Sequence, residues 1–335
     1  MGRLREQALK ASIRLALIVG FSILFQSAYV YSQGAANSVP LIEQDDALAI
    51  SDHVYVILDD NRRFVPNVGI VVGNKATLVI DPGLGLKNGE IVLEEARKLS
   101  SNTKFFIAST HVHAEHDLGA GAFPQEATMI RSQDQQRDIE EFDLQHAGRL
   151  SKRSKVLANL LENAFTRPAD VLCDTKCTID LGGVNVTLQA VGPAHTFGDT
   201  AFFVEEDRVL FSGDVVMRRY PRFASPTSGL EVWLSALTEL KHFDFDVLVP
   251  SHGPLGGTES IEAYEAYFTH IHSRVGELLA KKVSTDTIVE QITLELLPEL
   301  SDWKEDGARF IDIAVRKAID EANLKLTSLS ESEAP

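Results

Sequence analysis

Three histidines and two carboxylates fall within the seven residues from His111 to Asp117, in the order His-Val-His-Ala-Glu-His-Asp. The apolar run at 104–108 comes directly before them and predicts a short buried strand. A loop that leaves such a strand can turn several side chains toward one point. Imidazole nitrogens and carboxylate oxygens together suit zinc, with iron or manganese as alternatives. The run therefore predicts a metal site.

Other polar residues stand where further strands should end. His195, Asp214 and His252 each follow an apolar run, and Gly or Pro lies close to each of them. Asp81, within Leu-Val-Ile-Asp-Pro-Gly, has the same setting. Each of these residues taken alone is an ordinary turn residue. Together they predict a set of side chains that converge from several strand ends.

The ordered set resembles the metallo-β-lactamase superfamily, whose pattern is a strand-end Asp, then His-x-His-x-Asp-His, then a His, an Asp and a final His. The resemblance covers roughly residues 50–255. It implies an α/β protein, a four-layer αββα sandwich with a dinuclear metal site in the cleft between two sheets. Carried over by position, it assigns one metal to His111, His113 and His195, a second metal to Glu115, His116 and His252, a bridging role to Asp214, and an orienting role to Asp81.

Glu115 departs from the family pattern, because Asp is usual at this position. Its side chain is one methylene longer, so it could ligate through a changed rotamer, displace the second metal or leave that site weak. Asp117 is a candidate substitute ligand. We expect one tight metal site and one weaker site.

The expected chemistry follows from charge. Two divalent cations, zinc in the first place, acidify a water molecule so that it can attack near neutral pH. Glu115 or Asp214 would accept or relay its proton. The predicted function is metal-dependent hydrolysis of a small-molecule ester, thioester, lactone or related substrate, including phosphorus or sulfur esters.

Three alternatives stay open. A zinc β-lactamase is disfavoured, because those enzymes usually carry Cys or Ser where this chain has Asp214. A mononuclear iron persulfide dioxygenase would need one metal on His111, His195 and Asp214. A non-enzymatic periplasmic accessory protein of a quinoprotein system would need a degenerate metal site.

Arg218, Arg219 and Tyr220 follow Asp214 closely and could grip a substrate carboxylate, or could belong to a solvated loop. Histidines outside the motifs are predicted to be structural or on the surface: His53, His146, His242, His270 and His272. Trp233 and Trp303 lie on helical patterns and are predicted to pack in a core.

Composition narrows the class of partner. The chain is 44% hydrophobic and 24% charged, with a formal net charge of −16. Nucleic-acid binding needs clustered Lys and Arg, so this acidity disfavours it. A small-molecule substrate is expected, and the oligomeric state does not follow from the sequence.

The N-terminus is typical of a secretory signal peptide. Four basic residues within 1–14 precede an apolar run at 15–25 and small residues up to Ala36. The apolar run is shorter than the roughly 18–20 residues that span a bilayer. The sequence predicts a signal peptide at 1–36, a periplasmic or secreted product, and no stable membrane insertion after cleavage; an uncleaved anchor is the alternative. Residues 37–335 then form one domain, with a core at about 50–255 and a helical extension at about 256–328.

The two cysteines, Cys173 and Cys177, are separated by three residues that resemble a turn. In an oxidising compartment they could form a disulfide. Two free thiols, or a metal pair, are the alternatives.

The apolar patterns predict the elements that position these residues. Strands are expected at 53–58, 68–73, 77–80, 104–108, 178–181, 184–191, 201–204, 209–211 and 246–249. Helices are expected at 87–99, 133–165 (one or two surface helices), 228–241 and through 258–326, with Thr258 and Ser284 as candidate N-caps.

Overall fold

The computed structural model describes residues 39–142, 144–217, 219–300, 303 and 307–332. The predicted leader at 1–36 and Arg218 lie outside the described residues. Among the described helices, none is both long enough and apolar enough to cross a membrane.

The first sheet has seven strands in the order β1-β2-β3-β4-β5-β6-β7. They are β1 (Ala47–Ala49), β2 (Val54–Ile57), β3 (Val68–Val72), β4 (Thr77–Ile80), β5 (Phe105–Ala108), β6 (Thr128–Ser132) and β7 (Val171–Cys173). Because successive side chains point to opposite faces, Leu78 and Ile80 of β4 face the second sheet, whereas Val79 faces helix α2 (Gly85–Leu99). Both faces of the sheet are buried, which explains a central strand without polar alternation.

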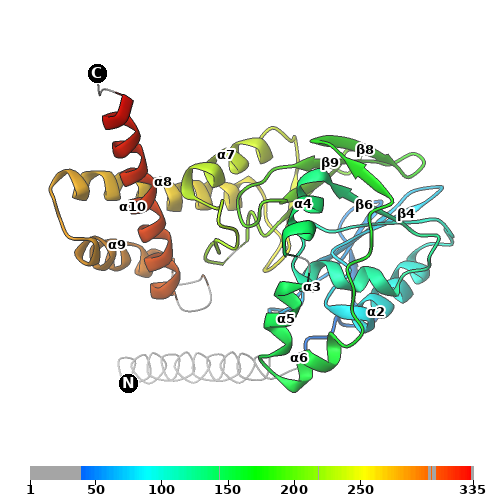
Figure 1. Cartoon of the computed structure of the whole chain (residues 1–335). Coiled ribbons are helices and arrows are strands. Elements are labelled where there is room, and N and C mark those ends of the chain that lie inside the picture. Colours follow the sequence, from blue (N-terminus) through cyan, green and yellow to red (C-terminus); the bar gives the residue numbers. More distant parts are fainter. Residues whose placement is uncertain (1–38, 143, 218, 301–302, 304–306, 333–335) are drawn as a thin grey trace, which may run out of the picture.

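The second sheet has five strands in the order β12-β11-β10-β9-β8. They are β8 (Lys176–Asp180), β9 (Asn185–Ala190), β10 (Thr200–Val204), β11 (Val209–Gly213) and β12 (Val247–Pro250). Phe202 and Phe211 pack against the first sheet, and Leu210 and Leu248 pack under helix α7 (Leu230–Leu240) on the other face. The two sheets with helices outside them confirm the predicted αββα sandwich (Figure 1).

Two pairs of parallel neighbours place the strand ends that matter. β4 and β5 run parallel in the first sheet, and β11 and β12 run parallel in the second. The carboxyl ends of parallel strands meet at one edge of a sheet. The residues that leave these four strands therefore lie at two edges that face each other across the sandwich.

The inserted segment after β6 forms three short helices, α4 (Gln133–Phe142), α5 (Gln145–Ser151) and α6 (Lys155–Leu160), where one or two were predicted. Helix α4 is fastened to two loops of the core. Gln135 Nε2 donates to Ser109 O at 2.6 Å, and Gly198 N donates to Asp138 Oδ2 at 2.8 Å. A Cβ on Gly198 would lie 2.5 Å from Gln135 Cα, so this close approach requires glycine.

The helical extension consists of α8 (Thr258–Ala280), α9 (Thr285–Glu299) and α10 (Gly307–Ser332), which lie on the α7 side of the molecule (Figure 1). Trp233 is fully buried and packs against Phe268 in a tilted arrangement, with a ring-centroid distance of 5.3 Å. Trp303 packs against Tyr264 at 5.2 Å. The predicted packing of both tryptophans is confirmed, and α7 and the extension share one hydrophobic core.

Three strands, β1, β6 and β7, were not predicted, and the N-cap of α8 differs from the predicted one. β1 and β7 have three residues each, too few to show a periodic pattern, and β6 contains a charged Arg131. Ser284 caps α9 as predicted, accepting from Thr287 N. The N-cap of α8 is Gly257, and Thr258 is the first residue of the helix.

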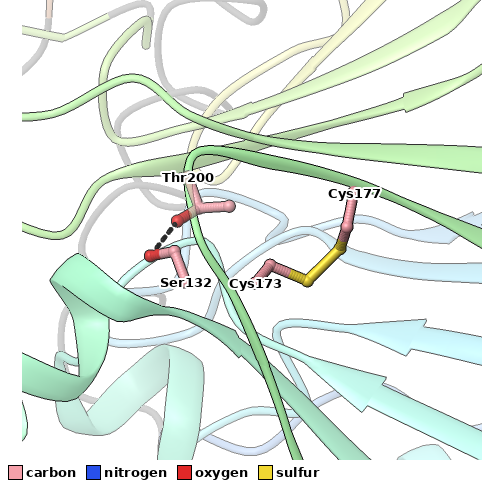
Figure 2. The surroundings of a disulfide bond; sticks show 4 residues. All are labelled: Ser132, Cys173, Cys177 and Thr200. Atoms are coloured by element: carbon pink, nitrogen blue, oxygen red, sulfur yellow. Dashed lines mark hydrogen bonds between the residues drawn. A yellow bond between two sulfur atoms is a disulfide. The ribbon is translucent and has the colours of Figure 1, made fainter.

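Cys173 and Cys177 are joined by a disulfide, with their Cα atoms 5.8 Å apart. Cys173 belongs to β7 of the first sheet and Cys177 to β8 of the second, so the bond joins the two sheets (Figure 2). Beside it, the Ser132 and Thr200 hydroxyls form a hydrogen bond of 3.1 Å from β6 to β10 (Figure 2). At this end of the sandwich, two contacts therefore link the two sheets: the disulfide and the Ser132–Thr200 hydrogen bond.

Candidate metal centre

The seven predicted ligands gather between the two sheet edges. They come from the end of β5, helix α3 (Ala114–Asp117), the β9–β10 loop, and the ends of β11 and β12: His111, His113, Glu115, His116, His195, Asp214 and His252. All except the half-buried His113 are buried. Groups of three donor atoms within 4.8 Å of one another connect every member of the set.

His111, His113 and His195 form the first group. His113 Nδ1 lies 3.0 Å from His111 Nε2 and 3.1 Å from His195 Nε2. Nitrogens bound to one tetrahedral zinc at about 2.0–2.1 Å are separated by roughly 3.3 Å. The three nitrogens are therefore spaced as ligands of a common ion.

Glu115, His116 and His252 form the second group. Asp214 lies between the two groups. Its Oδ2 is 3.4 Å from His195 Nε2, and its Oδ1 is 3.9 Å from the Nε2 atoms of both His116 and His252. One carboxylate thus faces both groups, which is the placement of a bridging ligand.

Three atoms at this point lack the partner that a buried polar atom needs. Among the described residues, Glu115 Oε2, His116 Nε2 and Asp214 Oδ1 are buried without a hydrogen bond. Unpaired buried polar atoms are costly and uncommon. Here two of them come from α3 and the third from the residue that follows β11. A metal ion would satisfy all of them, so the residues present fit a metal.

The protonation of the site in the metal-free protein agrees with this fit. Burial, together with neighbouring histidines, holds the pKa values of His111 and His113 well below the usual range, so both imidazoles are neutral and able to ligate. Burial lowers the pKa of His116, but Asp81, Asp214 and Glu115 together raise it to about 9. Burial raises the pKa of Asp214, but His252, His195 and His116 bring it to about 2. The carboxylates thus favour a positive charge at His116, whereas His111 and His113 remain neutral nitrogen donors.

Asp81 supports the site from the end of β4. It accepts hydrogen bonds from Thr110 N at 2.7 Å and Ser251 Oγ at 2.8 Å, and its Oδ2 lies 3.0 Å from His116 Nδ1. One carboxylate therefore ties the β5 loop, the β12 loop and a candidate ligand together. Such a contact fixes the tautomer and direction of the imidazole.

Asp117, the candidate substitute for Glu115, has a different partner. Arg131 Nη1 and Nη2 donate to its two carboxylate oxygens at 2.6 and 3.0 Å, and Ser109 Oγ also donates to it. Both charged side chains are buried. Asp117 anchors α3 to β6 and does not join the metal ligands.

His146 was predicted to be structural or on the surface, and the structure corrects this. It comes from α5 and stacks on His113 with a ring-centroid distance of 4.0 Å. Its Nδ1 lies 3.4 Å from Glu115 Oε2 and accepts from Ala114 N at 3.1 Å. No motif places it there, because the insert that carries it packs over the site only in the folded chain.

A two-chambered cavity opens over the candidate ligands. The chamber at the ligands has a volume of about 200 Å³ and is lined by His113, Glu115, His146, His195 and Asp214 with Phe64, Arg149, Arg153, Arg222 and Ala224. The other chamber, of about 250 Å³, is lined by Val112, Phe142, Ala224 and Pro226 together with more polar residues. The chambers share His113, His146, Arg149 and Ala224. A small molecule can reach the ligands here.

Comparison with known proteins agrees with the ligand pattern. The model of the metallo-β-lactamase superfamily matches residues 61–252, which is more than half of the chain. The chain belongs to the metallo-β-lactamase superfamily. The matched region begins before β3 and ends at His252, so it contains every candidate ligand of this superfamily member.

Two curated proteins are similar in sequence to this chain. A linear primary-alkylsulfatase from Pseudomonas sp. is 25% identical over 258 residues, covering 65% of this chain and 48% of the relative. A probable metallo-hydrolase from Streptococcus pyogenes serotype M6 is 26% identical over 205 residues, covering 56% of this chain and 79% of the relative. The chain thus spans about half the length of the alkylsulfatase.

Solved structures show the same fold. A metallo-β-lactamase from Pontibacter korlensis superposes with a TM-score of 0.54 at 19% identity, covering 67% of this chain and 98% of its own. The sec-alkylsulfatase Pisa1 from Pseudomonas sp. superposes with a TM-score of 0.60 at 13% identity, covering 82% of this chain and 49% of its own.

The candidate substrate residues lie apart from the cavity lining. Tyr220 is buried, packs on Trp303 and donates to Leu300 O at 3.3 Å, so its side chain belongs to the helical core. Arg219 donates to Asp59 Oδ2 at 2.9 Å. Neither lines the chambers described above. After Asp214 the chain packs Tyr220 against the helical extension and Arg219 against Asp59. Their nearness to Asp214 in sequence therefore does not place their side chains over the metal ligands.

Asp59 and Asn67 support His252 and were missed. Asp59 Oδ2 accepts from Gly253 N at 3.1 Å and lies 3.8 Å from His252 Nδ1. Asn67 Nδ2 donates to Pro250 O and Gly253 O at 2.7 and 2.9 Å. Asp59 follows β2 closely, so the strand-end rule that identified Asp81 could have found it. Nothing in its local sequence marks Asn67.

Proposed function

We propose that this protein is a dinuclear metallohydrolase that cleaves an ester-type bond of a small molecule. The observation that carries the proposal is the pair of three-residue ligand groups joined by Asp214, with three unpaired buried atoms at their centre. His111, His113 and His195 would hold one ion, and Glu115, His116 and His252 the other. Nitrogen and oxygen donors in this combination favour zinc.

When bound, divalent cations supply Lewis acidity, which makes water a nucleophile near neutral pH and polarises a substrate oxygen. The residues of the chain supply position and proton transfer. Asp81 orients His116, and Asp59 holds the backbone at Gly253 next to His252. Asp214 and Glu115 would be the carboxylates that accept a proton. The cavity holds the substrate beside them.

The names of the relatives support hydrolysis, since one is an alkylsulfatase and the other a metallo-hydrolase. The name of the alkylsulfatase favours the sulfate ester among the sulfur and phosphorus esters that the sequence already suggests, beside carboxylic esters, thioesters and lactones. The dioxygenase alternative predicts a deficient second group, yet Glu115, His116 and His252 provide a full set of donor types. We propose export to the periplasm or exterior on the basis of the leader sequence alone.

The test is metal analysis combined with a substrate panel. Zinc-reconstituted protein should hold close to two ions and hydrolyse at least one of a carboxylic ester, a thioester, a lactone, a β-lactam and an alkyl sulfate. His195→Ala should abolish both the tight site and turnover, whereas His242→Ala, an exposed histidine on the surface, should change neither. A protein that binds metal yet hydrolyses none of the panel would count against the enzymatic function. A protein that binds no metal would overturn the proposal entirely.

A further inference from the structure

Three arginines line the ligand chamber of a strongly acidic protein. Arg149, Arg153 and Arg222 surround the space beside Glu115 and Asp214, although the chain carries a net charge of −16. The two carboxylates would be compensated by the metal ions that they bind. The space left for a substrate is then bordered by positive charge, and a cleft walled by protein strengthens such a field.

Arg149 and Arg153 belong to the inserted segment and not to the core. Arg149 lies in the last turn of α5, and Arg153 lies between α5 and α6. The Arg153 guanidinium carbon is 5.6 Å from the ring centre of Phe64, which also lines the chamber. This contact holds the cation at the cavity wall.

Arg149 has no acid of its own. Among the described residues, no hydrogen bond or ion pair involves its guanidinium, although the segment around it is rich in Asp and Glu. A guanidinium at a cavity wall offers several N–H donors in a plane, an arrangement that matches a carboxylate or sulfate group.

The second chamber has a different character. Val112, Phe142, Ala224 and Pro226 give it an apolar wall, and its remaining lining includes Asp138, Gln145, Thr196 and Ser225. Arg149 and His146 stand where the two chambers join. His146 Nδ1 accepts from Ala114 N, so its neutral ring carries the proton on Nε2 as a further donor. An anionic group and an apolar group could therefore be held on either side of this junction.

We propose that Arg149 and Arg153 form an anion subsite, and that the substrate is an amphiphilic anion whose carboxylate or sulfate oxygens contact these arginines while its apolar part occupies the second chamber. The proposal rests on the proposed function, because it places this substrate beside the metal ligands. The alkyl part is limited by the volume of about 250 Å³. The arginines of the insert, and not the ligands shared with the superfamily, then set specificity.

Binding to the metal-loaded full chain tests the subsite without requiring turnover. Isothermal titration with hexyl sulfate, hexanoate and 1-hexanol should show both anions binding about tenfold or more tightly than the alcohol. In the double variant Arg149→Met, Arg153→Met, the preference for anions should fall about tenfold or more, and the matched Lys variants should retain part of it because they keep the charge. Arg137→Met, an exposed arginine on α4 paired with Asp134, is the control and should change nothing.

The two anionic ligands, hexyl sulfate and hexanoate, distinguish a subsite for sulfate from a subsite for carboxylate. A loss of hexyl sulfate binding alone assigns the subsite to sulfate esters, a loss of hexanoate binding alone assigns it to carboxylates, and a loss of both supports the shared chemistry. Equal affinity for the anions and the alcohol in the wild type, or no change of preference in the double variant, would overturn the proposal. Circular dichroism and metal content of each variant exclude misfolding, and the Lys pair repeats the test if the Met pair fails to fold.

Kinetics distinguish this proposal from the proposed function. If esters are hydrolysed, the ratio of kcat/KM for mono-p-nitrophenyl glutarate to that for neutral p-nitrophenyl butyrate should fall in the double variant, mainly through KM. If the wild type hydrolyses nothing while the anion preference still depends on Arg149 and Arg153, the proposed function fails and the subsite stands.

Discussion

Glu115 is the residue at which this chain departs from its superfamily, and its surroundings explain how the longer arm is used. Its carboxylate is buried, one oxygen lacks a hydrogen bond, and His146 lies 3.4 Å away. Burial would raise its pKa, but His146 and His116 lower it below the usual value, so the group is an anion. A second metal ion would give this buried carboxylate the positive partner that it lacks.

Glu115→Gln should keep the shape and remove the charge. We expect the affinity for the second ion to fall at least about tenfold, with slower turnover and an unchanged first site. Glu115→Asp restores the usual reach and should tighten the second site. Stepwise zinc titration by calorimetry measures both. Unchanged stoichiometry and turnover in Glu115→Gln would remove Glu115 from the metal centre.

Asp59 offers a second test at the scale of one side chain. It accepts from Gly253 N, and its charge lies 3.8 Å from His252 Nδ1. Asp59→Asn removes that charge and weakens the hold on the loop that carries His252. Outer partners of metal ligands typically contribute about 10–100-fold in affinity. We expect a loss of this order for the second ion only, by calorimetry. Asp60→Asn, its exposed neighbour, is the control; equal effects of both variants would contradict the role given to Asp59.

Among the elements, α3 depends on one buried ion pair. Arg131 of β6 and Asp117 of α3 are both buried and bonded through two oxygens. Removing one partner leaves an uncompensated buried charge, which costs about 3–5 kcal/mol. Arg131→Met should lower the free energy of unfolding by this order in urea titrations, and adding Asp117→Asn should recover part of it. Arg137→Met breaks an exposed pair and should cost less than about 1 kcal/mol. Similar losses in the two single variants would show that the buried pair has no special role.

Helix α4 meets the His195 loop through Asp138, and this contact should depend on pH. Burial raises the pKa of Asp138 from 3.8 to about 6, with Asp199, Glu141 and Asp134 adding to the rise and the Gly198 N–H opposing it. The folded protein therefore binds this proton more tightly than the unfolded chain. The resulting stabilisation is complete below pH 3.8 and is lost as the pH rises through 6.

Asp138→Asn keeps an acceptor for Gly198 and cannot ionise. In metal-free protein, where no bound cation counters the charge, the variant should gain stability relative to wild type as the pH rises from 4.5 to 8. Allowing for partial solvent screening, the gain is on the order of 1 kcal/mol. Thermal unfolding at the two pH values measures it, with Glu140→Gln, an exposed acid on the same helix, as the control. A difference that does not change with pH would contradict the assignment.

The whole molecule is a sandwich closed at one end by Cys173–Cys177 and extended at one side by α8–α10. The disulfide joins the two sheets, yet it closes a very short loop. By loop-closure entropy, a loop of this length contributes about 2 kcal/mol. Cys173→Ser with Cys177→Ser should lower the free energy of unfolding by this order in urea, and wild type with reductant should behave alike. A loss well above about 3 kcal/mol would mean that the bond also orders the native sheets.

The sequence by itself determined the candidate ligands and the fold class, for a physical reason. A metal site needs particular donor atoms at strand ends, and donor types, strand-end turns and their order along the chain are all local properties. Hence the order of residues along the chain was enough to name His111, His113, His116, His195, Asp214 and His252, and Asp81 with them.

Only the tertiary structure decided which distant side chains complete the site. His146, Arg149, Asp59 and Asn67 lie in segments whose local pattern shows ordinary helix, turn or loop, and they reach the ligands because the insert and the sheet edges pack together. Tyr220 and Arg219 show the converse, since they are close to Asp214 in sequence but are turned by the chain toward the extension and Asp59. Chain proximity fixes which residues can share a loop, whereas packing between layers fixes which of them share a cavity.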